Sequence, residues 1–276
     1  MARLSFDTYG KTDVRLTYVA RNGARHEVRE LNVNLFFEGD FNAAYRDGDN
    51  SGVLPTDTMK NTVYVLAKQL RWNDIETFAR GVSGHFLARV PQLKQVRVEI
   101  SETPWEHIGN HPAAFQQSGA ERRITKLTAS QSERLFKSGL RNLQILKTAH
   151  SAFTGFTKDE FTTLAETNDR LFGTVLNAEW TYHRADLDFN ALYKSIRETL
   201  LNTFAEHHSR SVQHTLFAMA EAVVKAYDAV GDIHLTMPNK HLLLVDLAKF
   251  GLENPNQIFV PTDEPSGFIE ARVNRQ

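Results

Sequence analysis

Three histidines, His207, His208 and His214, form the best histidine cluster in the sequence for a metal site. Imidazole nitrogens bind zinc and exchange protons near neutral pH. The three lie where one predicted helix ends and the next begins, and no Cys or carboxylate completes the spacing of a zinc site. This position is more typical of solvated helix ends, so the sequence predicts no bound metal.

Motifs of the common enzyme classes are missing from the sequence. It contains no Gly-x-Gly-x-x-Gly, no Gly-x-x-x-x-Gly-Lys-Ser/Thr phosphate loop, no His-Glu-x-x-His and no Gly-x-Ser-x-Gly. It also contains no Cys, which excludes disulfides, thiolate nucleophiles and Cys-held metal or iron–sulfur centres. Any catalysis must therefore use other side chains.

The composition is that of an ordinary globular protein of enzyme size. The 276 residues carry 32 Lys and Arg against 33 Asp and Glu, for a formal net charge of -1. This balance offers no electrostatic reason to bind nucleic acid or an anionic membrane. The first residues lack the apolar core of a signal peptide, and the longest strongly apolar run, 242–245, is too short to cross a bilayer. The last residues do not form a peroxisomal import tail, so we expect a cytoplasmic protein that binds neither nucleic acid nor membrane.

Elements in the first half of the chain follow the order strand, strand, helix, helix, strand, strand. Residues 14–20 and 28–37 are rich in β-branched and aromatic residues, and Arg21-Asn22-Gly23 between them predicts a hairpin turn. Helical spacing of apolar residues follows from Asp57 and again after Asp74. Alternating patterns at 96–100 and 122–128 predict two further strands.

Elements in the second half repeat this order. Strands are expected at 140–147 and 171–182, separated by a long insertion at 148–170. Helical spacing runs from Phe189 to Leu200 and from Val212 to Tyr227. Further strands are expected at 233–237, 242–247 and 267–273. The repeat of element order, rather than of residue identity, predicts an α+β chain of two duplicated domains, 1–136 and 137–276.

Each predicted domain is an antiparallel sheet with both helices on one face. The other face and the open edges of such a sheet need cover. Closing the sheets into a ring or barrel would provide it, so we expect a homo-oligomer.

Six segments, in order along nearly the whole chain, resemble successive motifs of urate oxidase, the cofactor-independent uricase family. They are YGKTDVRL from Tyr9, DNSGVLPTDTMKNTVY from Asp49, SAFTGFTKDEFTTL from Ser151, TNDRLF from Thr167, SVQHT from Ser211 and MPNKH from Met237. The resemblance implies two tandem tunnelling-fold (T-fold) domains per subunit. It also implies a homotetramer that surrounds a central tunnel and has its active sites at subunit interfaces.

The resemblance implies a definite reaction. Urate reacts with dioxygen and water to give 5-hydroxyisourate and hydrogen peroxide, the first step of urate degradation. No metal or organic cofactor takes part, because a further deprotonated urate is electron-rich enough to reduce dioxygen itself. The protein then has to position the substrate, stabilise an anion and transfer protons.

Substrate-binding roles follow from the same motifs. Arg170 would grip one edge of the purine with the two parallel hydrogen bonds of a guanidinium, and Gln213 would meet the opposite edge with its amide. Phe153 would lie under the purine plane. Apolar walls and a neighbouring hydroxyl would come from Leu164, Val212 and Ser211. Without the motifs, Arg170 would be read as a surface residue and the apolar residues as core.

Other motif residues imply the oxygen and proton chemistry. Thr56 and Asp57 would reach the substrate from a neighbouring subunit, although Asp57 precedes a helix expected from Thr58 and would serve equally as its N-cap. Lys11, Thr56 and His241 would form a proton relay, which requires a neutral lysine at a subunit contact. Asn239, with Thr56, would hold dioxygen and then water above the ring.

Two details depart from the family pattern. Pro55 stands before Thr56 where a small residue is usual, and Phe161 replaces a frequent Tyr; the proline restrains Leu54 to extended geometry.

Two other functions stay open. One alternative is another T-fold enzyme acting on pterins or GTP, but such pockets are anchored by Glu and often need zinc, whereas Gln213 stands here. The other is a catalytically silent purine-binding protein, which would not need the relay.

Overall fold

The computed structural model describes residues 4–21 and 23–276. The chain forms two compact units. The first consists of the chain up to Leu140 together with Thr181–Tyr193, and the second of Arg141–Trp180 together with Lys194–Gln276. Asn22, in the predicted hairpin turn, lies outside the described residues. The division into domains 1–136 and 137–276 stays a prediction.

The first unit is built on an antiparallel sheet whose strands follow the order β1 (Tyr9–Ala20), β2 (Glu27–Gly39), β3 (Leu93–Thr103), β6 (Arg122–Ser130) and the start of β7 (Arg134–Lys147). The predicted hairpin is confirmed, with Tyr9 opposite Phe37 and Ala20 opposite Glu27. Its pairing shifts at a bulge directly after Lys11.

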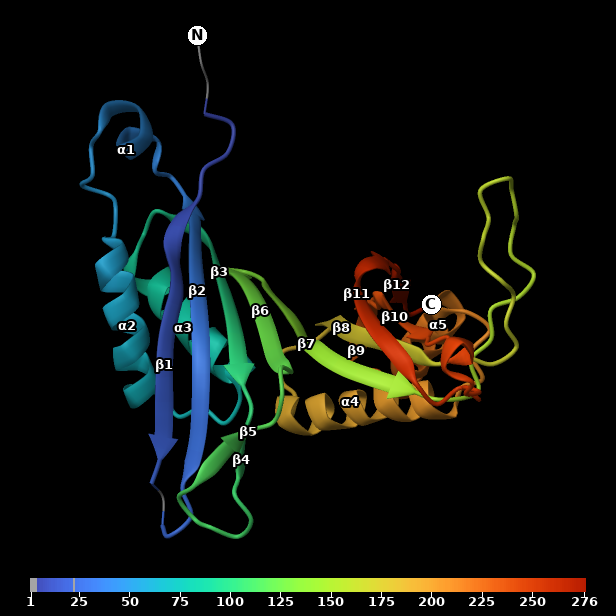
Figure 1. The fold of residues 1–276 in the computed structure, drawn as a ribbon. Helices are drawn as coiled ribbons and strands as arrows, with labels where there is room; N and C mark the ends of the chain where they lie inside the picture. Colours follow the sequence, from blue (N-terminus) through green and yellow to red (C-terminus); the bar gives the residue numbers. More distant parts are fainter. Residues whose placement is uncertain (1–3, 22) are drawn as a thin grey trace. The chain divides into compact units, whose positions relative to one another are not determined.

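Two helices cover one face of this sheet, as the apolar spacing predicts (Figure 1). They are α2 (Thr56–Gln69) and α3 (Ile75–Arg89). The α3 N-cap is Asp74, whose carboxylate accepts a hydrogen bond of 2.6 Å from the Thr77 N–H. Alternate residues of β2 and β3 meet the buried stripes of both helices in one apolar core, which includes Leu31, Val33, Leu35, Phe37, Val96, Val98, Met59, Val63, Phe78 and Phe86.

Three short elements of the first unit were not predicted. They are α1 (Asn42–Asp47) and a separate hairpin of β4 (Trp105–His107) and β5 (Phe115–Gln117). Helix α1 has no buried residue, and the two strands have three residues each. Elements this short bury too little apolar surface to leave a periodic pattern.

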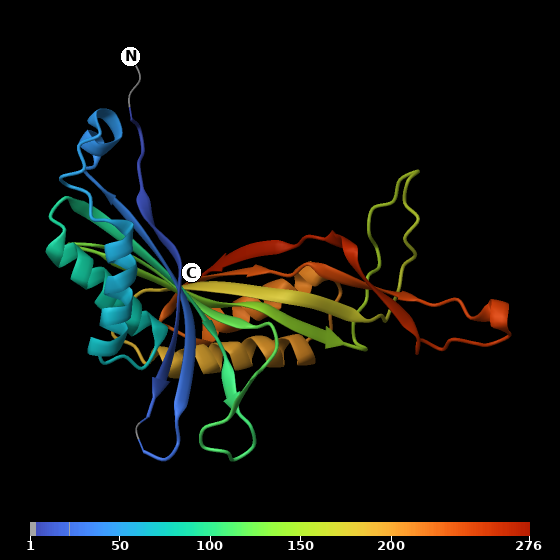
Figure 2. The ribbon, with the colours of Figure 1, turned by 60° about the vertical axis from the view of Figure 1, so that its left-hand side comes forward.

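The second unit repeats the arrangement. Its antiparallel sheet contains the end of β7, β8 (Phe172–Tyr182), β10 (Asn239–Leu244) and β11 (Phe259–Gly267), while β9 (Val230–Thr236) pairs with β8 and with β12 (Glu270–Asn274). Helix α5 (Val212–Ala226) and the part of α4 (Phe189–Glu206) from Lys194 onward lie along one face of this sheet (Figure 2). The predicted mixed α+β fold with antiparallel sheets is thus confirmed.

The C-terminal strands differ from the prediction. The single strand expected at 267–273 is two strands, β11 and β12, interrupted at residues 268 and 269. Strand β11 also begins well before the expected segment, because its sequence, FVPTDEPSG, contains two prolines and two acidic residues that obscure a strand pattern. Strand β10 starts at Asn239 rather than 242 and is followed by the short 3-10 helix η1 (Ala248–Phe250).

The predicted insertion at 148–170 projects from the second unit as a long loop (Figure 2). Two isolated bridges fasten its base, Ser151 to Ser209 and Phe153 to Thr167. No helix in the described part of the chain is long and apolar enough to pass through a membrane.

Candidate active site

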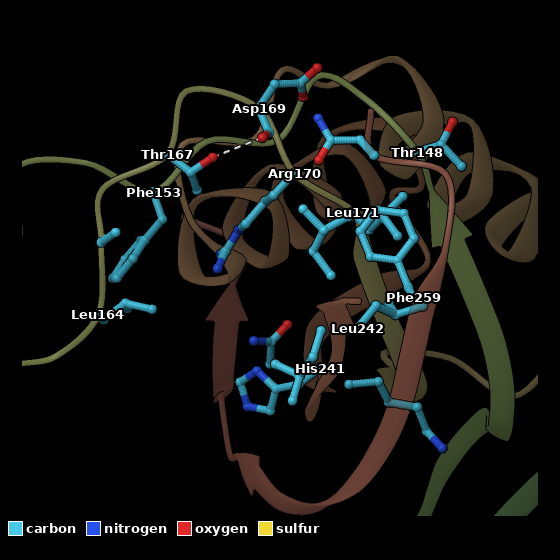
Figure 3. Close-up of a pocket in the computed structure, with 16 residues that line it drawn as sticks. Thr148, Phe153, Leu164, Thr167, Asp169, Arg170, Leu171, His241, Leu242 and Phe259 are labelled. Atoms are coloured by element: carbon cyan, nitrogen blue, oxygen red, sulfur yellow. Dashed lines mark hydrogen bonds between the residues drawn. The ribbon is translucent and has the colours of Figure 1, made fainter. Parts of the chain in front are cut away.

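A cavity of about 430 Å³ opens in the second unit between the insertion and strands β10 and β11 (Figure 3). Its size falls in the range of small-molecule sites. Its lining includes five of the residues that the motifs predict to be functional: Phe153, Leu164, Arg170, Asn239 and His241. The fold therefore brings segments distant in sequence around one space.

Arg170 ends the insertion just before β8, and its guanidinium points into the space between Phe153, Leu164 and His241 (Figure 3). Its Cζ lies 5.2 Å from the centre of the Phe153 ring. Its Nε is buried and has no hydrogen-bond partner among the residues that the structure describes. Burial lowers the pKa of Arg170 from its ordinary value. A partly buried cation with a free donor at a cavity is suited to bind a planar anion.

Backbone hydrogen bonds hold the main chain of Phe153 at the cavity. The Phe153 N–H donates to the Thr167 carbonyl at 2.8 Å, and the Thr167 N–H donates back to the Phe153 carbonyl at 3.1 Å. Asp169 reinforces this pair, because its carboxylate accepts from the Ser151 N–H at 3.1 Å and its carbonyl accepts from the Thr167 hydroxyl at 2.8 Å. No role was predicted for Asp169 from the sequence. The only signal for it in the sequence is its position between Thr167 and Arg170.

The start of α5 is joined to the same segment. Ser209 accepts a 2.7 Å hydrogen bond from the Ala152 N–H, and its hydroxyl donates to the Ser211 carbonyl at 3.0 Å. Ser211 is the N-cap of α5 and accepts from the His214 N–H at 3.1 Å. Val212 is buried and Gln213 is exposed at this helix start, and neither they nor Ser211 are among the residues around the cavity. Their contact with a substrate stays a prediction.

Strand β10 contributes Asn239 and His241 to the cavity. Asn239 pairs with Thr174 of β8 and with Gly267 of β11, and His241 pairs with Thr262. The Thr262 hydroxyl donates to the His241 carbonyl at 3.3 Å. An amide and an imidazole thus lie on one short strand, two residues apart.

Lys11 belongs to the first unit, on β1 next to the bulge. A side chain at Gly10 would stand 1.8 Å from the Leu35 carbonyl oxygen, so only glycine allows this approach of β1 to β2. After Lys11 the chain turns through Asp13, at a φ of 56°, whose N–H donates to the Asn34 side chain at 2.7 Å. The bulge fixes the direction in which the strand presents Lys11.

Thr56 and Asp57 begin α2 and are both exposed. The interpretation of Asp57 as the N-cap is wrong: the helix begins at Thr56, and the N-cap is Pro55, which makes no side-chain capping bond. The Asp57 carboxylate instead accepts from Lys60 and, at 2.9 Å, from the Asn61 amide. The pKa of Asp57 is lowered mainly by the Lys60 hydrogen bond and charge, with a further contribution from Lys11.

Tyr9 connects these two parts of the first unit and was missed in the sequence. Its hydroxyl accepts a 3.1 Å hydrogen bond from the Leu54 N–H, two residues before Thr56. Its ring packs edge-on against Phe37 and Phe41, and burial raises its pKa. Tyr9 thus ties the strand of Lys11 to the loop of Thr56. A lone tyrosine before a polar turn gives no periodic signal.

His207, His208 and His214, the candidate metal site in the sequence, lie close to one another in the second unit. The His207 and His214 rings are 4.3 Å apart, and His207 Nδ1 is 3.1 Å from the Thr215 hydroxyl. Within residues 4–21 and 23–276, no three His, Asp or Glu side chains are grouped so as to hold a metal ion.

Comparison with known proteins gives consistent matches over almost the whole chain. The uricase family model matches residues 7–128 and 136–270. A uricase of Arthrobacter globiformis is 41% identical over 273 residues, covering 99% of this chain and 90% of the relative. A uricase of Dictyostelium discoideum is 36% identical over 282 residues, covering 100% and 98%. The crystal structure of the Arthrobacter globiformis uricase matches with a TM-score of 0.97 and 40% identity, covering 100% of this chain and 96% of that one.

Proposed function

Because the chain belongs to the uricase family, we propose that it is a urate oxidase that converts urate, dioxygen and water to 5-hydroxyisourate and hydrogen peroxide. The observation that carries this proposal is the pairing of the Arg170 guanidinium with the Phe153 ring at 5.2 Å in a cavity of about 430 Å³. A flat anion such as urate needs both an apolar face and a fixed cation.

Arg170 would bind the urate anion edge-on while Phe153 supports its plane. The Arg170 Nε has no hydrogen-bond partner within the described part of the chain, which supports this role, since a second donor beside the terminal nitrogen allows two parallel hydrogen bonds. Gln213, in the first turn of α5, would meet the opposite edge with its amide. Leu164 and Val212 would limit the pocket, with Ser211 holding the helix start beside it.

The proton path would run through Lys11, Thr56 and His241. Urate at neutral pH is a monoanion, and removal of a further proton produces a dianion that can transfer electrons to dioxygen. Lys11 would accept this proton through the Thr56 hydroxyl, and His241 would complete the path. The exposure of Thr56 at the first residue of α2 supports this role.

The oxygen site would use Asn239 and Thr56 above the ring. The two electrons of urate reduce dioxygen, which leaves as hydrogen peroxide with two protons. Water then supplies the hydroxyl group at the oxidised carbon. The atoms balance without a further electron donor, so the reaction asks the protein for positioning and proton transfer.

We further propose a homotetramer whose active sites lie between subunits. Lys11, Thr56 and Asp57 belong to one compact unit, and the residues around the cavity belong to the other. Apolar side chains of β10 and β11 are exposed, including Leu243 at 56% and Val260 at 51%. Strands β1 and β11 end the path of paired strands and offer edges to other copies. Light scattering should give about four times the chain mass of 31.3 kDa; a monomer at micromolar concentration would contradict the assembly.

The test of the function is loss of urate absorbance in aerated buffer with a metal chelator and no added flavin. We expect one hydrogen peroxide released for each urate consumed. Absence of turnover would contradict the enzyme, and turnover abolished by the chelator would contradict the cofactor-free reaction. Urate binding without peroxide release would instead favour a silent purine-binding protein.

A further inference from the structure

Four side chains of the insertion contact one another in succession, and two of them, Arg170 and Phe153, line the cavity. The Arg170 Cζ lies 5.2 Å from the Phe153 ring centre, and the Phe156 ring is stacked on Phe153 at 4.8 Å with only 13° between their planes. The Lys158 ammonium follows at 5.4 Å from the Phe156 ring centre. Each of the two parallel rings therefore has a cation near it. This contact is favourable because the face of an aromatic ring is negative and attracts a positive charge.

A tight turn brings Phe156 back onto Phe153. Gly155 stands between them at a φ of 70°, a conformation that favours glycine. Glu166 lies beside this turn, because its carboxylate forms a 2.9 Å ion pair with Lys158; its pKa is lowered mainly by Lys158, with a smaller contribution from the Gly155 N–H. Glu166 directly precedes Thr167, whose backbone already pairs with Phe153.

The stacking of Phe156 is specific within this loop. Phe161, the next aromatic residue of the insertion, is 81% exposed, whereas Phe156 is half-buried against Phe153. No periodic core pattern passes through the loop. Phe156 thus gains its burial at the ring that borders the cavity.

We propose that Phe156 is a positioning residue for substrate binding, which fixes the plane of the Phe153 ring on which the purine lies. This inference rests on the proposed function, since it concerns the same platform. The two hydrogen bonds to Thr167 hold the Phe153 backbone but leave the torsions of its ring free. Stacking on Phe156 restricts those torsions before the substrate arrives, so binding has less conformational entropy to lose.

Four variants of the full chain test the proposal: Phe156→Leu, Phe156→Tyr, Phe161→Leu and Glu166→Gln. Urate oxidation gives KM and kcat for each, and urate titration in oxygen-free buffer gives the dissociation constant. Phe156→Leu should raise KM and the dissociation constant about threefold to tenfold, the range expected for loss of an aromatic pair. The value of kcat should change less than about twofold, because the platform supports substrate and transition state alike.

The other variants separate positioning from loop folding. Phe156→Tyr keeps the aromatic ring and should bind urate as tightly as the wild type. Phe161→Leu should also bind urate as the wild type does. Glu166→Gln should weaken binding in the same direction but less. Wild-type KM and dissociation constant in Phe156→Leu, or an equal loss in Phe161→Leu, would overturn the proposal alone. A wild-type chain that neither binds nor oxidises urate would overturn the proposed function and this inference together.

Discussion

Arg170 and Phe153 meet at the cavity although a long loop separates them in the sequence, with the guanidinium carbon 5.2 Å from the ring centre. The loop folds back on itself through the paired backbones of Phe153 and Thr167 and the Asp169 carboxylate. A cation and a flat apolar face are thereby held by a few hydrogen bonds at the base of the loop. The loop therefore shapes the cavity together with strands β10 and β11, which supply Asn239, His241 and Phe259.

Arg170→Gln should lower kcat/KM for urate about 100-fold, because two charge-assisted hydrogen bonds are lost. Arg170→Lys is the matched variant: it keeps the charge but not the planar fork, so its activity should fall between the two. Urate titration without oxygen should show the same order of affinities. Equal affinity of wild type and Arg170→Gln would remove this residue from the site.

Lys11→Met should lower kcat about 100-fold or more with a small change in KM, because it removes a proton acceptor and not a substrate anchor. Steady-state kinetics at several pH values would measure this. The control is Lys94→Met, an exposed lysine of the same unit, which should behave as the wild type. A change confined to KM would assign Lys11 to binding instead of proton transfer.

Glu76→Gln should lower the free energy of unfolding by about 3 kcal/mol, because it leaves a largely buried guanidinium without its counter-charge. The fully buried Glu76 pairs with Arg123 at 2.7 Å and accepts from the Ser138 hydroxyl at 2.6 Å. Urea denaturation at fixed protein concentration would measure the loss. The exposed pair of Lys225 and Glu221 is the control, and Glu221→Gln should cost less than about 0.5 kcal/mol.

Acidification should weaken the folded state through His207. Burial lowers the pKa of His207, and the His214, Lys147 and His208 charges lower it further. The folded chain therefore binds this proton less readily than the unfolded chain, so the contribution to stability is present above the ordinary histidine pKa of about 6.5 and is lost as the pH falls below it. The measurement is Tm between pH 7.5 and pH 5.5.

His207→Gln should show a smaller decrease in Tm over that range than the wild type, since glutamine carries no titrating proton. His183→Gln, at an exposed position, should follow the wild-type curve. An identical pH dependence in all three proteins would contradict a role for His207 in acid sensitivity.

The long helices and strands could be predicted because each buries one face. Phe78, Val82 and Phe86 repeat at helical spacing along α3, and Leu31, Val33 and Leu35 alternate along β2, and all six are buried. Helix α1, the β4–β5 hairpin and most of β11 bury little and therefore gave no comparable pattern. The N-cap of α2 was predicted wrongly at Asp57 because the actual cap residue, Pro55, makes no side-chain hydrogen bond and so gives no capping signal in the sequence.

The sequence by itself determined the order of the main elements, their duplicated arrangement and, through its motifs, the family. Only the tertiary structure decided that Phe153, Arg170 and His241 border one cavity, that Phe156 stacks on Phe153, and that Tyr9 ties the strand of Lys11 to the loop of Thr56. The physical reason is that helices and strands bury one face, so their apolar residues repeat at regular spacing in the sequence. Loops are held by a few isolated backbone hydrogen bonds, such as the two at Thr167, and by single torsions, such as the positive φ of Gly155, and neither leaves a repeating pattern in the sequence.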